Sequence, residues 1–63
     1  MTQLIVRAVK DCKGDKDEVL MHQHERGVVQ GFVTFKEREV HAVVVKENLT
    51  IVSIDINKLV AID

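Results

Sequence analysis

Proline, tryptophan and tyrosine are absent from this chain, and cysteine occurs once, at Cys12. A single cysteine cannot form an intramolecular disulfide, which excludes the disulfide-rich scaffolds of small secreted proteins. A lone thiol is instead typical of the reducing cytoplasm. With no Trp, no Tyr and only two Phe, the chain cannot build an aromatic cage for methylated side chains or an aromatic-lined groove for proline-rich peptides.

Long hydrophobic runs and an excess of one charge are also lacking. No apolar run approaches the roughly 20 residues that span a bilayer. Residues 1–3 carry no basic charge, and the apolar run that follows ends at Arg7, so we expect no signal peptide and a cytoplasmic protein. Nine Lys and Arg oppose ten Asp and Glu, for a net charge of −1. The basic patch that is typical of nucleic-acid binders is therefore missing.

The 63 residues allow one domain, spanning residues 1–63. A domain of this size buries only about 60% of the surface that its unfolded chain exposes, so its stability is marginal. Disulfides and rigid prolines are not available to raise that stability. The hydrophobic content of 46% leaves apolar surface for association, which is the remaining way to stabilise so small a core.

The residues that are present predict strands. Val, Ile, Thr and Phe dominate short segments that polar, turn-prone clusters separate, a pattern typical of small barrels and sandwiches. Gly31 lies within one of these segments and predicts a bulge or bend, and Asn48 is expected to take a positive φ in a tight turn. The expected strands cover residues 2–10, 17–22, 28–35, 40–46 and 49–55, followed by a 3₁₀ turn near 57–58 and a last short strand.

Residues 15–26 leave an alternative open. Asp15 and Glu18 have the spacing of a capping box and Gly27 resembles a helix stop, so one short helix in an α+β fold is possible there. The apolar patch at 19–21 has no continuation one helical turn later, however, and an amphipathic helix needs a sustained stripe. We therefore predict an all-β fold of five or six antiparallel strands. Strand parity gives the expected core: Val19, Met21, Val29, Val33, Ala42, Val44, Ile51 and Leu59, with Leu4 and Val6.

From Asp17 onward the order of features resembles the SH3-like small barrels, in particular the Tudor and KOW-type modules. An acidic residue and a hydrophobe open a strand at Asp17-Glu18-Val19, and a polar loop leads to a glycine and a bent strand at 27–33. A hairpin over 40–54, a short turn and a leucine-bearing last strand at 55–60 complete the match. The resemblance implies a barrel over residues 17–62, with residues 1–10 as an additional N-terminal strand along a barrel edge. The family's aromatic cages and basic RNA-binding loops have no counterpart here.

Few residues are candidates for chemistry. His22, His24 and His41 are the histidines, and with Cys12 and Glu25 they show no recognised zinc-ligand spacing. Neither Cys12 nor Ser53 has a recognisable base or oxyanion hole beside it, and Glu37 and Glu39 flank a turn as solvated loop residues. We expect a protein that is not an enzyme, with no catalytic residues, no metal, no cofactor and no small-molecule substrate.

Consecutive apolar residues, as at 43–45, are unusual in a sheet that has one face in water. A partner that covers one strand face would explain them, and the strand at 2–10 would offer an edge for pairing. The expected function is therefore a small protein-interaction module, accessory or regulatory, that self-associates or docks on a larger protein. The alternative is a nucleic-acid-binding barrel, whose affinity would fall steeply with salt. The candidate partner-binding residues are Val28, Phe32, His41, Val43 and Val45.

Overall fold

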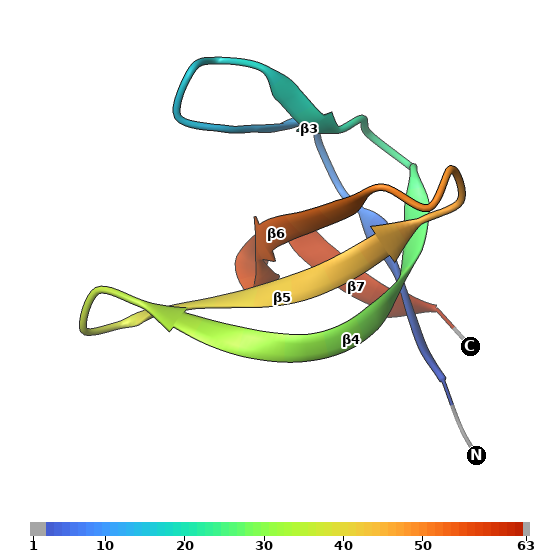
Figure 1. The fold of residues 1–63 in the computed structure, drawn as a ribbon. Coiled ribbons are helices and arrows are strands. Elements are labelled where there is room, and N and C mark those ends of the chain that lie inside the picture. Colours follow the sequence, from blue (N-terminus) through green and yellow to red (C-terminus); the bar gives the residue numbers. More distant parts are fainter. Residues whose placement is uncertain (1–2, 63) are drawn as a thin grey trace.

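The computed structural model describes residues 3–62, and its regular elements are strands apart from one 3₁₀ turn (Figure 1). The predicted all-β class is confirmed, and the helix considered over 15–26 is wrong, because that segment consists of turns around a short strand. The elements are β1 (Leu4–Ala8), β2 (Cys12–Lys13), β3 (Val19–Met21), β4 (Arg26–Phe35), β5 (Glu39–Lys46), β6 (Ile51–Asp55), η1 (Ile56–Lys58) and β7 (Leu59–Ile62).

Five strands form one antiparallel sheet in the order β6-β5-β4-β1-β7, and β2 pairs with β3 in a separate hairpin. We expected the N-terminal strand to lie along an edge, but the structure places it inside the sheet. β1 pairs on one side with β4, where Ile5 faces Val28, and on the other with β7, where Val6 faces Ala61. The sheet edges are β6 and β7 instead. The arrangement is compatible with a small barrel-like domain.

The long strand β4 allows one sheet to curve around the core, as Figure 1 shows. Its first half pairs with β1, and its register with β5 shifts between Val29 and Gly31. This irregularity confirms the bend expected at Gly31, since a bulge bends its strand and increases the local twist. Gly27 has a different role: a Cβ there would meet the Val44 side chain and lie 2.9 Å from the Val45 carbonyl oxygen. Only glycine fits this close approach of β4 to β5.

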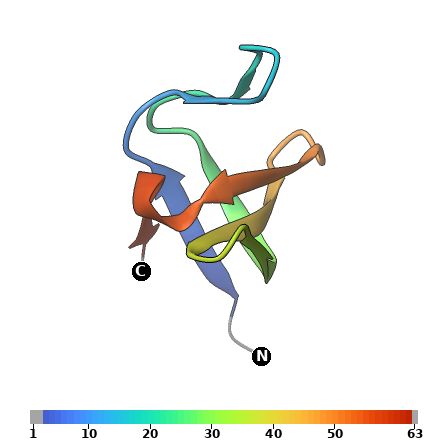
Figure 2. The ribbon, with the colours of Figure 1, turned by 90° about the vertical axis from the view of Figure 1, so that its left-hand side faces the viewer.

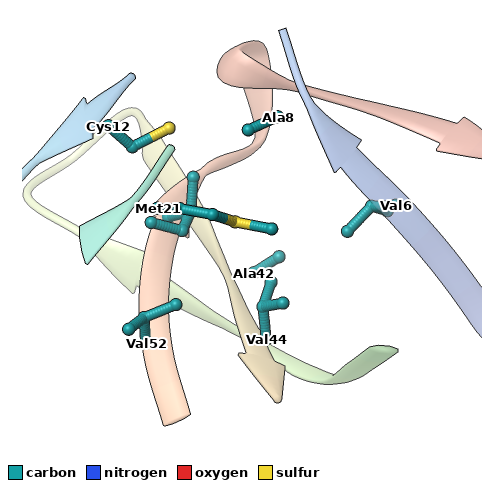
Figure 3. Packing of buried hydrophobic residues seen from close by; sticks show 8 residues of the cluster. Val6, Ala8, Cys12, Met21, Ala42, Val44 and Val52 are labelled. Atoms are coloured by element: carbon teal, nitrogen blue, oxygen red, sulfur yellow. The ribbon is translucent and has the colours of Figure 1, made fainter. Parts of the chain in front are cut away.

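The core consists of small and medium-sized side chains, and in Figure 3 the Met21 side chain lies at its centre. Met21 and Val44 are fully buried, and Leu20, Val29 and Leu59 pack against the cluster as partly buried side chains. The buried hydrophobic residues are Val6, Ala8, Cys12, Met21, Ala42, Val44, Val52 and Ile54.

Several residues of the expected core are exposed. The register pairs Val44 with Val52 and Ala42 with Ile54, so Val52 and Ile54, rather than Ile51, share the core side of the sheet. Val33 faces His41 because the bulge reverses the parity of β4 beyond Val29. The predicted core residues that the structure exposes are Leu4 at 43%, Val19 at 39%, Val33 at 39% and Ile51 at 65%.

The turns lie where the sequence predicts them, but in the β5–β6 turn the positive φ belongs to a different residue than expected. Asn48 is not the residue with positive φ in the β5–β6 turn; Leu49 is, at 69°, while the Asn48 side chain accepts a hydrogen bond from the Thr50 amide at 3.0 Å. The 3₁₀ turn predicted near 57–58 is confirmed as η1. Asp55 caps η1 by accepting a hydrogen bond from the Asn57 amide. Within residues 3–62 no helix has the length and apolar character needed to cross a membrane.

Candidate interaction surfaces

Both faces of the curved sheet carry exposed apolar side chains, and the predicted partner-binding residues divide between them. Val28 lies opposite Val45 in the register, and Val43 and His41 follow on the same outer face of β5. These four side chains are half-buried. Phe32 lies opposite Ala42, so it belongs to the core side of the sheet. The structure therefore brings four of the five residues onto one face and places Phe32 on the other.

Phe32 is 59% exposed although it lies on the core side of the sheet. It lines an apolar hollow of about 170 Å³ between β4 and the β1–β7 pair. Two further large exposed hydrophobic residues line the same hollow: Leu4 and Ile56. Small patches are ordinary on soluble proteins, and large apolar side chains gathered around one hollow make a candidate interaction surface. We call Leu4, Phe32 and Ile56 the Phe32 surface.

One free edge of the sheet borders the Phe32 surface. The strand β7 reads Leu-Val-Ala-Ile, and among the residues that the structure describes it pairs with β1 alone, so its other side is an edge without proline or charge. Natural proteins usually protect an edge with charged residues, proline, a bulge or a covering segment. The opposite edge, β6, is contacted by β3 of the hairpin. The β7 edge is therefore open for pairing beside an apolar hollow.

A second hollow, of about 470 Å³, lies between the β2–β3 hairpin and the outer face of the sheet. Figures 1 and 2 show this hairpin projecting beyond the body of the fold, on the side of β6. The hairpin is tied down at its base: the Lys46 ammonium donates to the Leu20 carbonyl at 2.8 Å and lies 3.5 Å from the Glu25 carboxylate. The charged groups that line the hollow are balanced, since they comprise Lys13, Lys36, Lys58, Asp15, Glu39 and Asp55.

His41 is a polar side chain of the second hollow that contacts both Phe35 and Ser53. Its ring centroid lies 4.3 Å from that of Phe35, at a tilt of 56°. Its Nδ1 lies 3.4 Å from Ser53 Oγ, and Asp55 lies directly opposite His41 in the β5–β6 register. Glu39, His41 and Asp55 each place a possible metal-ligating atom within 4.8 Å of the others. We call these three residues the β5–β6 triad.

The other candidates for chemistry lie apart from the triad. His24 Nδ1 lies 2.9 Å from an Arg7 guanidinium nitrogen, and His22 is exposed in the same turn. Cys12 is buried, and burial raises the pKa of its thiol above the ordinary value of 9.0 despite the opposing charge of Lys58. A raised pKa lowers the fraction of reactive thiolate. Within residues 3–62, the β5–β6 triad is the one group of three metal-ligating side chains that converges.

Sequence reasoning selected His41 but missed Asp55 and Phe35 as its neighbours. Strand alternation places Glu39 and His41 on one face, and that signal was available in the sequence. The position of Asp55 depends on the β5–β6 register, and the position of the hairpin depends on contacts between distant segments. No family model matches the chain, and no curated protein or solved structure is similar to it at a significant level.

Proposed function

We propose that this chain is a small non-catalytic interaction module with an SH3-like barrel, and that its first partner is a second copy of itself. The order of elements supports the SH3-like topology: a bent long strand, β4, is followed by a hairpin, a 3₁₀ turn and a last strand that returns to β1. The observation that carries the function is the Phe32 surface beside the open β7 edge. The Phe32 surface offers side-chain contacts, and the β7 edge beside it offers backbone hydrogen bonds.

Pairing of β7 with β7 of a second copy is the arrangement that fits this edge. Antiparallel pairing about a two-fold axis gives both copies the same contacts, as in most homodimers. The backbone groups of β7 that face away from β1 then gain partners, and the adjoining Phe32 surfaces become covered. A segment of Leu-Val-Ala-Ile requires no charge to be buried in this pairing. The proposed module is thus a homodimer with a sheet continuous across both copies.

Sedimentation velocity at micromolar to millimolar concentrations tests the proposal. We expect the wild-type chain to dimerise, and Phe32→Ala to shift the equilibrium to monomer by removing a large apolar contact. Phe35→Ala is the matched control, because Phe35 is also exposed, at 47%, and lies on the opposite face of the same strand. A substitution in the edge itself, Ala61→Lys, should also give a monomer.

The results distinguish three outcomes. A wild-type chain that is monomeric throughout the range would overturn self-association. Dimerisation that Phe35→Ala removes and Phe32→Ala does not would move the interface to the outer face of the sheet. Circular dichroism of each variant shows whether the fold is retained, so loss of the dimer is not confused with loss of the fold.

A further inference from the structure

Three potential metal ligands meet on the outer face of the sheet, where β5 and β6 run side by side. Glu39 and His41 are two residues apart in β5, so both point to the same face. Asp55 is the register partner of His41 in β6. The ligating atoms of the three side chains all lie within 4.8 Å of one another. This convergence is independent of the Phe32 surface, which lies on the other side of the sheet.

We propose that the β5–β6 triad binds a divalent transition-metal ion such as Zn²⁺, with water completing the coordination. One imidazole and two carboxylates form a donor set that Zn²⁺ accepts, at metal–ligand distances of about 2.0–2.2 Å. Adjacent ligands of a tetrahedral ion then lie about 3.3 Å apart. The Glu39 side chain is exposed, so it can rotate toward the other two ligands.

Two of the three ligands are already held in position by neighbours that are not ligands. Ser53 Oγ lies 3.4 Å from His41 Nδ1, and Nε2 is the other nitrogen with which the imidazole can bind a metal. The Phe35 ring packs against the imidazole at 4.3 Å between centroids. The Asn57 amide donates to Asp55 Oδ1 at 2.9 Å, so Oδ2 remains available. Contacts of this kind orient ligands in established metal sites.

Neither carboxylate of the triad forms a salt bridge within the described residues, although Lys13, Lys36 and Lys58 line the same hollow. Within residues 3–62 the salt bridges join Lys13 to Asp17 and Lys46 to Glu25. The carboxylates of Glu39 and Asp55 thus have no cationic side chain as an ion-pair partner in that range. Two carboxylates held close together repel each other unless a positive charge lies between them. A metal ion supplies that charge.

Isothermal titration of the metal-free full chain with zinc chloride tests the site, with a parallel NMR titration to locate the ion. We expect one ion per chain and the largest shifts at Glu39, His41, Ser53 and Asp55. His41→Gln and Asp55→Asn should each weaken binding about 10-fold or more, the scale seen when contacts at a metal site are removed. Asn at position 55 retains an oxygen that can cap η1, so this variant should stay folded.

His22→Gln and His24→Gln are the matched controls, because both histidines are exposed and lie in the turn before β4. Zinc affinity should be unchanged in both. Binding that these variants abolish, or that survives His41→Gln unchanged, would overturn the proposal. The absence of any heat or NMR shift at millimolar zinc would also overturn it. A monomeric wild-type chain would contradict the proposed dimer and leave this test unaffected.

Discussion

Gly27 and Gly31 lie in the same strand and have opposite surroundings. A Cβ at position 27 would lie 2.9 Å from the Val45 carbonyl oxygen, whereas at position 31 nothing lies within 4 Å. Backbone cannot move aside as a flexible side chain can, so we expect Gly27→Ala to lower the free energy of unfolding by about 1–3 kcal/mol. Gly31→Ala should be neutral or stabilising by up to about 1 kcal/mol. Urea denaturation of both variants measures the difference, and equal effects would contradict the close packing at Gly27.

Because of Cys12, we expect the free energy of unfolding to depend on pH in the alkaline range. Burial, the largest cause, raises the pKa of its thiol in the folded protein above the ordinary value of 9.0. The contribution of the protonated thiol is therefore fully present below that ordinary value and is lost as pH rises through the folded pKa. We expect wild type to lose more stability than Cys12→Ala between about pH 8 and about pH 10.5. Parallel slopes in urea melts across this range would show that the thiol titrates as it does in the unfolded chain.

At the scale of elements, Lys46 attaches the β2–β3 hairpin to the sheet. Its ammonium group donates to the Leu20 carbonyl and approaches Glu25, and its side chain is only 12% exposed. Lys46→Met keeps the apolar stem and removes both contacts, so the free energy of unfolding should fall by about 1–3 kcal/mol. Hydrogen exchange should also accelerate in the hairpin before the rest of the sheet.

The control for this element is Lys13→Met. The Lys13–Asp17 ion pair lies within the hairpin at 3.7 Å, and its side chains are 54% and 84% exposed. Solvent screens such a pair, so its loss should change stability by less than about 1 kcal/mol. If both variants have the same effect, the hairpin is held by Met21 and Cys12 in the core rather than by Lys46.

For the whole molecule, the small size of the core is the reason to expect that association contributes to stability. The radius of gyration is 11.0 Å, and the described residues bury eight hydrophobic residues in the core, which is little for independent stability. If the proposed dimer forms, its association free energy adds to folding. The melting temperature should then rise with protein concentration. Phe32→Ala should remove this dependence, whereas Phe35→Ala should retain it, and calorimetry at several concentrations provides the measurement.

The sequence by itself determined the all-β class, the bend near Gly31, the 3₁₀ turn after Asp55 and much of the core. These features are local: β-branched residues favour strands, and the alternation of Ala42 and Val44 identifies the core side of β5. The absence of a sustained apolar stripe after Met21 excluded the helix. Each of these inferences depends on residues that are close together in the chain.

Only the tertiary structure decided what depends on pairing between distant strands. The bulge before Gly31 reversed the parity of Val33, and the β5–β6 register buried Val52 in place of Ile51. The position of β1 between β4 and β7 left β7, rather than β1, as the open edge. The approach of Asp55 to His41 is likewise a cross-strand contact. A shift of one residue in register moves every side chain of a strand to the other face, and short-range sequence patterns do not specify that register.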